Sequence, residues 1–181
     1  MALVPSVVVT LAPHEMLRSH TVAGGERRTI MLMMVDVKVR GTMRAAPDAV
    51  FAFLADLENW PRWQSDMQTT TLVEGQRAQP GARYRYISKA MGQTLDSTIR
   101  LVRADAPREV AFEGEWAGMI RPSGRYLIEP APDGTLVTLN PHPETRGLGK
   151  VMAPLIGVMI KRLNRKHLDD LRQAVERPDA P

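Results

Sequence analysis

The chain contains no cysteine among its 181 residues, so it forms no disulfide and offers neither a thiolate metal site nor a cysteine nucleophile. Long apolar runs are also missing. The longest, from Gly147 to Ile160, is interrupted by Lys150 and Pro154 and is shorter than the ~20 residues that a membrane span requires. The apolar piece at residues 3–11 lacks a preceding basic region and a clear cleavage site, which argues against secretion. We therefore expect a cytoplasmic protein.

Signatures of common catalytic and nucleotide-binding sites are absent. The four histidines, at positions 14, 20, 142 and 167, do not have a metal-ligand spacing such as HExxH. The serines lack the context of a nucleophile elbow, and no glycine-rich phosphate loop or nucleic-acid-binding motif occurs. We expect no metal, no cofactor and no nucleic-acid partner, and the sequence identifies no catalytic residue.

What is present fits one globular domain and two flanking segments. The composition, 44% hydrophobic and 24% charged, lies in the ordinary globular range, and the length suits one domain with a sizeable core. Residues 1–31 have neither aromatics nor a sustained period, which predicts a disordered leader or, given Met31, Met33 and Met34, a misassigned start. We expect a single domain over residues 32–177 and a disordered tail at 178–181.

Hydrophobic periodicity predicts a strand, a short helix, six strands and a long helix. Residues 35–43 alternate as a half-buried strand, and Pro47 opens a helical pattern that runs to about residue 57. Turn residues then separate strands near 68–74, 82–90, 93–104, 109–117, 120–129 and 135–140. Residues 148–175 predict an amphipathic helix whose apolar stripe is Met152, Leu155, Ile156, Met159, Leu163, Leu168, Leu171 and Val175.

Specific stretches carry a family resemblance over residues 35–175. They are APDAVFAFLADLENWPRW (46–63), GARYRY (81–86), REVAFEGEW (108–116), GRYLIEPAPDGTLVTL (124–139) and RGLGKVMAPLIG (146–157). The chain thereby resembles the START-like or SRPBCC superfamily, in its polyketide cyclase/dehydrase and lipid-transport branch. The resemblance implies an α+β helix-grip fold: a curved antiparallel sheet of about seven strands wraps around a long C-terminal helix, with short helices after the first strand. It also implies a cavity between the sheet and that helix.

One stretch departs from the pattern of the family. Residues 140–143 read Asn-Pro-His-Pro where the final strand ordinarily continues. Because proline lacks the N–H that a strand ladder needs, we expect this strand to stop early or to run along an edge.

The candidate cavity residues are mainly aromatic, since phenol and indole groups can orient an apolar or aromatic ligand. Trp116 shares the strand parity of Val110 and Phe112, which predicts that it faces the cavity. Ordinary core filling is the alternative for each. The predicted cavity residues are Trp60, Trp63, Tyr84, Tyr86, Ser97, Phe112, Trp116, Tyr126, Met152, Leu155, Met159 and Leu163. The side chains that could handle protons are Asp66, Ser97, Tyr84, Tyr86, Tyr126 and Asn140.

Three functions compete. The first is the binding of a small hydrophobic molecule, lipid-like, aromatic or polyketide-like. The second is catalysis as a polyketide cyclase or dehydratase. The third is a peripheral membrane or protein-interaction module that uses the basic residues Lys161, Arg162, Arg165 and Lys166. These residues also fit a solvated helix face, because Arg165/Asp169 and Lys166/Asp170 are spaced for local ion pairs. The sequence does not predict an oligomeric state.

Overall fold

An open antiparallel sheet of seven strands forms the framework of the computed structural model, which describes residues 38–90, 92–118, 120–146 and 153–177. The order across the sheet is β1-β8-β7-β5-β4-β3-β2, and a two-stranded ribbon pairs β6 with β9. The strands are β1 (Val39–Met43), β2 (Met67–Glu74), β3 (Arg83–Ala90), β4 (Gln93–Asp105), β5 (Glu109–Gly114), β6 (Ile120–Arg121), β7 (Ser123–Ala131), β8 (Gly134–Pro141) and β9 (Glu144–Thr145). The predicted leader, tail and Met152 lie outside the described residues.

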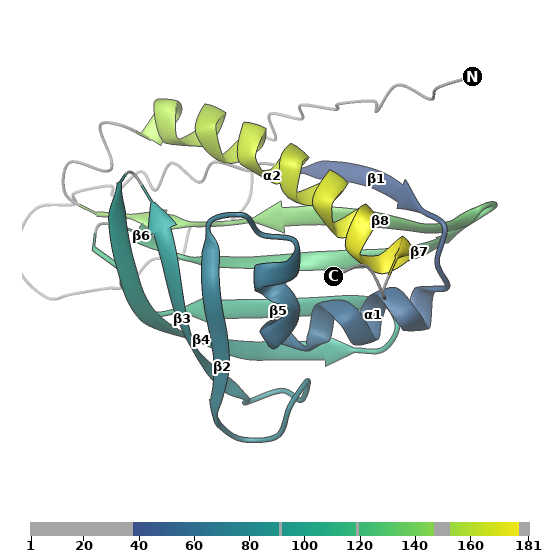
Figure 1. Ribbon diagram of the computed structural model, residues 1–181, viewed down its shortest axis with the longest axis horizontal. Helices are drawn as coiled ribbons and strands as arrows, with labels where there is room; N and C mark the ends of the chain where they lie inside the picture. The colour runs from purple at the N-terminus through teal and green to yellow at the C-terminus, as the bar shows by residue number, and fades with distance from the viewer. Residues whose placement is uncertain (1–37, 91, 119, 147–152, 178–181) are drawn as a thin grey trace, which may run out of the picture.

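Three helical segments cover one face of the sheet, which we call the inner face. They are α1 (Pro47–Ala55), the 3₁₀ helix η1 (Leu57–Arg62) and α2 (Ala153–Glu176). In Figure 1, α2 crosses the sheet and its yellow C-terminal end lies beside α1. A long C-terminal helix across an antiparallel sheet confirms the predicted helix-grip fold.

The connection between β1 and β2 forms two short helices, as the family resemblance implies, whereas periodicity alone predicted one continuous helix over about residues 47–57. Pro47 occupies the first turn of α1, where its missing N–H is not needed, and Val50 and Leu54 are buried one turn apart. Asp56 follows the last residue of α1 and precedes the first residue of η1. Its side chain accepts a hydrogen bond from the N–H of Glu58 and so caps the N-terminus of η1. Pro61 lies inside η1, so the turn expected at this proline takes a 3₁₀ form.

The proline-containing end of β8 differs from the expectation. The strand runs to Pro141, which pairs with Gly124 of β7, and on its other side β8 pairs with β1 as far as Leu139. It is therefore an internal strand and not an edge strand. Pro141 has no N–H to donate to a neighbouring strand. It is tolerated because the last described pair between β8 and β1 is at Leu139, two residues earlier.

Helix α2 is fixed to β1 through its C-terminal half. A Cβ atom at Gly41 would lie 2.8 Å from Cδ2 of Leu168, so the absence of a side chain there allows the helix to approach the strand closely. The Nε atom of Arg172 also donates a hydrogen bond to the carbonyl oxygen of Thr42, 2.9 Å away. Near the end of the helix, the Oε1 atom of Glu176 accepts a hydrogen bond from the N–H of Arg44.

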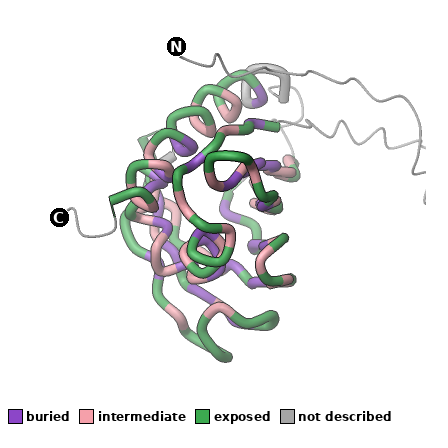
Figure 2. Tube along the Cα trace, turned by 90° about the vertical axis from the view of Figure 1, so that its right-hand side faces the viewer, coloured by how far each residue is buried: buried purple, intermediate pink, exposed green. Residues whose placement is uncertain are grey.

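The buried stripe of α2 is one residue out of step with the predicted stripe over its first half. Gly157, His167, Leu168 and Leu171 are buried, and the partly buried Ile160 packs on the core. Counting back from Leu171 in helical turns of 3.6 residues gives positions close to His167, Ile160 and Gly157, so these residues lie on one side of the helix. The predicted member Met159 is instead 43% exposed, and Leu163 is half-buried. Figure 2 shows buried stretches along the strands and exposed loops at their ends.

The outer face of the sheet carries charge, as the strand alternation predicts. On β3, Tyr84 and Tyr86 are buried on the inner face, and the alternating Arg83 and Arg85 point the other way. The guanidinium of Arg85 donates two hydrogen bonds to the carboxylate of Asp96 on β4, at 2.8 and 2.5 Å. This cross-strand pair lies on the outer face, and the inner face is the apolar side of the sheet.

Candidate functional site

Four buried rings form a continuous aromatic cluster on the inner face: Trp60, Trp63, Phe112 and Tyr126. The ring centroids of Trp60 and Phe112 lie 4.9 Å apart, those of Phe112 and Tyr126 5.3 Å, and those of Tyr126 and Trp63 5.6 Å. Both tryptophan contacts are edge-to-face, the geometry that the ring quadrupoles favour. The cluster joins η1 to the neighbouring strands β5 and β7, so three elements build one wall.

A polar cluster adjoins these rings. It comprises Gln64, Asp66, Tyr86, Ser97 and His167. The Nε2 atom of Gln64 donates to the hydroxyl oxygen of Tyr126 over 3.4 Å, and Tyr86 hydrogen-bonds to the side chain of Ser97, its direct partner across β3 and β4. Polar groups of four elements therefore meet at one side of the aromatic cluster.

The two phenols of this region remain protonated. Burial raises the pKa of Tyr126 and of Tyr86 above the ordinary value for tyrosine. Hydrogen bonds with Gln64 and Ser97 oppose this shift, while the negative charge of Asp66 adds to it. Each phenol can therefore donate a hydrogen bond, and the hydroxyl of Tyr126 keeps its own proton free because Gln64 acts as the donor in their contact.

Asp66, in the turn that precedes β2, lies in direct contact with His167 of α2. The Nε2 atom of His167 lies 2.9 Å from Oδ1 of Asp66. The distance suits an ion pair, yet neither atom makes a hydrogen bond of good angular geometry with a described residue. His167 is only 4% exposed and its ring packs edge-on to Trp63, with 6.0 Å between centroids. An acid and a base are thus held together beside the aromatic cluster.

Two buried donors in the aromatic cluster have no partner. Among the described residues, nothing accepts a hydrogen bond from Nε1 of Trp60 or of Trp63, and both atoms are inaccessible to solvent. A buried donor left unpaired costs about 1–3 kcal/mol. Oxygen atoms of a bound molecule or of ordered water would remove that penalty.

Several predicted site residues lie elsewhere. The hydroxyl of Tyr84 accepts a hydrogen bond from the N–H of Ala78 in the loop between β2 and β3, which ties up this phenol. Trp116 is 38% exposed, with the guanidinium of Arg146 stacked 4.6 Å from its ring centroid. The parity argument fails there because β5 ends at Gly114. The side chain of Leu155 lies outside the described set, as Met152 does.

Asn140 belongs to the opposite face. Its neighbour Leu139 pairs with Tyr126 of β7 and shares the inner face, so the alternation of β8 places Asn140 on the other face of the sheet, where its side chain is nevertheless fully buried. Of the predicted proton handlers, the structure therefore brings together Asp66, Ser97, Tyr86 and Tyr126.

Sequence reasoning missed Gln64 and His167. His167 directly follows the basic residues that fit a solvated helix face, and sequence reasoning considers it only among the histidines that lack a metal-ligand spacing. The available signal was its spacing, since it stands seven residues after Ile160 and four before Leu171, on one side of a helix. Of that basic group, Lys166 makes the predicted ion pair with Asp170 at 2.5 Å, while Asp169 lies 3.8 Å from Arg172.

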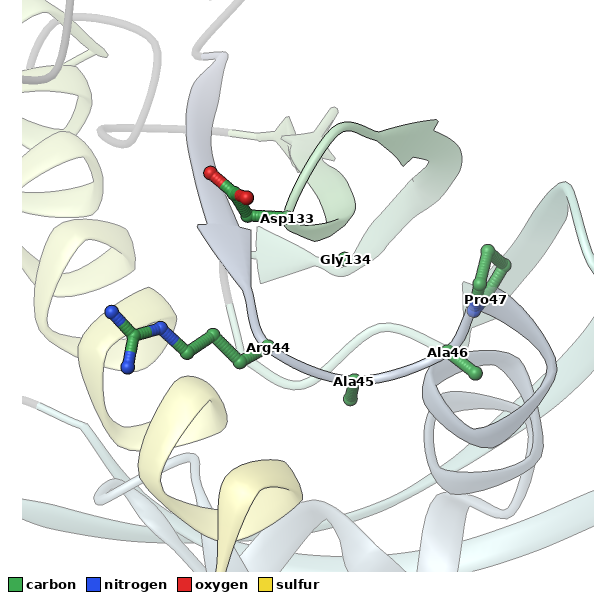
Figure 3. A pocket seen from close by; sticks show the side chains of 6 residues that line it. All are labelled: Arg44, Ala45, Ala46, Pro47, Asp133 and Gly134. Carbon is green, nitrogen blue, oxygen red and sulfur yellow. The ribbon is translucent and has the colours of Figure 1, made fainter.

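A separate open pocket of about 620 Å³ lies away from the aromatic cluster. It is formed where the link between β1 and α1 passes the turn between β7 and β8, and Figure 3 shows the side chain of Arg44 extending from this link toward α2. Its lining comprises Arg44, Ala45, Ala46, Pro47, Asp133 and Gly134. Small and backbone groups dominate this lining, so we place the candidate site at the aromatic and polar clusters.

The described residues form neither a metal-binding cluster nor a membrane-spanning helix. No group of three or more histidine, cysteine, aspartate or glutamate side chains in that part of the chain is placed to hold a metal ion. No helix within the same residues is long and apolar enough to cross a membrane.

Solved structures share the fold at low sequence identity. The Zhui aromatase/cyclase from a Streptomyces species superposes with a TM-score of 0.69 at 19% identity, covering 81% of this chain and 96% of that one. TTHA0849 from Thermus thermophilus gives 0.68 at 18% identity, with 80% and 99% covered. A START superfamily protein from Mycobacterium smegmatis gives 0.58 at 20% identity, with 79% and 94% covered.

A comparison with curated protein sequences finds no match. The family model described as "Polyketide cyclase / dehydrase and lipid transport" matches residues 34–176, which is most of the chain. This protein therefore belongs to the polyketide cyclase/dehydrase and lipid transport family, as the resemblance of its sequence led us to expect.

Proposed function

We propose that the protein binds a small, ring-containing hydrophobic molecule that carries oxygen atoms, between the inner face of the sheet and α2. The observation that carries the proposal is the pair of unpartnered indole donors inside the aromatic cluster, next to the free phenol proton of Tyr126. A purely aliphatic chain would leave these donors unpaired, whereas a ketone or hydroxyl group on a ring accepts from them and stacks on the same wall.

Two further findings support a binding role. Membership in a family whose description covers both polyketide cyclisation and lipid transport makes an apolar or polyketide-like ligand the natural class. The interior also combines apolar rings with a few converging polar groups, the composition typical of small-molecule sites. A peripheral membrane role for the basic residues of α2 remains a separate prediction from the sequence.

Tryptophan emission provides the test. Trp116→Phe removes the exposed indole, so the remaining emission comes from Trp60 and Trp63 in the cluster. We expect 2-tetralone, a fused-ring ketone, to quench this emission saturably with a Kd on the order of 10 μM. Quenching that rises linearly with concentration, for this ketone and for a panel of larger ring ketones, naphthols and fatty acids, would contradict the proposal.

Selectivity for oxygen should depend on Tyr126. Tyr126→Phe removes a hydrogen-bond donor while keeping the ring, so we expect 2-tetralone to bind about 5-fold more weakly and tetralin, which lacks the ketone, to bind within about 2-fold of the parent. The matched control is Tyr84→Phe, because the hydroxyl of Tyr84 is already occupied by the N–H of Ala78. Isothermal titration measures both ligands on both variants, and equal losses for the two ligands would assign Tyr126 a packing role only.

A further inference from the structure

The binding of an apolar molecule does not by itself require the contact between Asp66 and His167. A ligand site for an apolar molecule is served by rings and neutral donors, and burying a carboxylate beside an imidazole is unfavourable unless the two groups offset one another. Here the Nε2 atom of His167 and Oδ1 of Asp66 lie 2.9 Å apart, with the histidine almost wholly enclosed and the Asp66 side chain 29% exposed.

The arrangement matches that of a base and the group that orients it. The 2.9 Å contact is too poorly aligned for a good hydrogen bond, but the charge of the carboxylate still favours a proton on Nε2, and the lone pair of the ring is then on Nδ1. The ring stands edge-on to Trp63, whose own ring contacts Tyr126. A base, a neutral indole donor and a neutral phenol donor are therefore side by side, which are the parts needed to remove a proton beside a carbonyl group and to hold the oxygen that becomes negative.

We propose that His167 is a catalytic base that enolises a ring ketone bound in this site, with Asp66 as its positioning residue. The inference rests on the proposed binding function and adds chemistry to it. His167 takes the proton from the carbon next to the carbonyl: that C–H bond breaks, its electron pair forms the carbon–carbon double bond, and the carbonyl π pair moves onto oxygen, which accepts a hydrogen bond from Tyr126. Return of a proton to the same carbon restores the ketone, so no oxidant or other co-reactant is needed.

Deuterium exchange into 2-tetralone measures this step without knowledge of the natural substrate. In D₂O, the imidazole exchanges its proton with solvent, so each enolisation and reversal leaves one deuterium on the carbon, which mass spectrometry counts. We expect the wild-type chain to accelerate exchange above the buffer rate. His167→Gln, which keeps a polar side chain toward Asp66 but has no base, should lower the enzymatic rate about 10²-fold. Asp66→Asn should lower it about 10-fold, because the ring loses its orienting charge.

Chemical rescue separates a base from a structural histidine. His167→Ala should regain exchange in proportion to added imidazole, whereas thiazole, a ring of similar shape and far weaker basicity, should restore none. Lys166→Ala is the matched control on the exposed side of the same helix turn and should exchange at the wild-type rate. Circular dichroism and tetralone quenching show which variants remain folded and able to bind, and His167→Gln covers the case in which the alanine variant unfolds.

The outcomes distinguish the two proposals. Saturable binding of 2-tetralone with no exchange above buffer, or with equal exchange in wild type and a folded His167→Gln, overturns the catalytic role and leaves the binding function standing. Equal rescue by thiazole and imidazole likewise overturns it. If neither 2-tetralone nor any compound of the ligand panel binds, the binding function and the catalytic role fall together.

Discussion

Leu171→Asp is expected to unfold the domain or to leave it barely stable. Leu171 has 0% of its surface exposed and lies on the stripe of α2 that packs into the core with Leu168. A carboxylate at this position loses its hydration without gaining a partner, and removal of the leucine also leaves a cavity. We expect a loss of about 4 kcal/mol or more, a large part of the 5–15 kcal/mol that stabilises a typical domain. Urea unfolding followed by circular dichroism measures it.

The same helix provides two controls. Gln173→Asp introduces the same charge at an exposed position two residues away, so it should change stability by about 0.5 kcal/mol or less. Leu163→Asp tests the corrected stripe. Because Leu163 is only half-buried, its carboxylate stays partly hydrated, and the loss should fall between those of the other two variants. A loss for Leu163→Asp as large as that for Leu171→Asp would restore the stripe expected from the sequence.

Gly134→Ala should be the most damaging alanine substitution among the described glycines. The residue opens β8 with a φ of 135°, which side chains rarely adopt, and a Cβ atom there would lie 2.1 Å from the carbonyl oxygen of Met43. That oxygen belongs to the backbone of β1, so relief requires two strands to separate. We expect a loss of about 3 kcal/mol or more in the free energy of unfolding.

Gly81→Ala separates the conformational effect from the clash. Gly81 also has a positive φ, 94°, but a Cβ atom there meets nothing within 4 Å. Its substitution should therefore show only the backbone strain, about 1–2 kcal/mol. Chemical denaturation of both variants under one condition gives the two free energies of unfolding. Equal losses would mean that the backbone of β1 at Met43 moves away from residue 134 at little energetic cost.

The order of elements was predictable because its signals are local. Alternation along β3 placed Tyr84 and Tyr86 on one face and Arg83 and Arg85 on the other, and glycine and proline marked the turns between successive strands. Pro47 likewise marked the start of α1 within one residue. Each of these features depends on the conformations of a few neighbouring residues, so it can be predicted without knowledge of the partner elements.

The phase of α2 was predicted only in part. An apolar stripe drawn through Met159 and Leu163 is as periodic as one drawn through Ile160 and His167, and hydrophobicity favours the first. The structure selects the second: Ile160 and His167 lie on the core side and Met159 is exposed, while the close approach of Leu168 to Gly41 holds the helix against β1. Trp116 shows the same limit, since its predicted direction assumed that β5 continues beyond Gly114.

The sequence by itself determined the helix-grip fold, the family and the placement of all its aromatic residues, 5% of the chain, inside the domain. Only the tertiary structure brought Asp66 within 2.9 Å of His167 and set Trp63 between His167 and Tyr126. The physical reason is distance along the chain: Asp66 and His167 are about a hundred residues apart, and no local periodicity encodes a contact made when the last helix closes over the sheet.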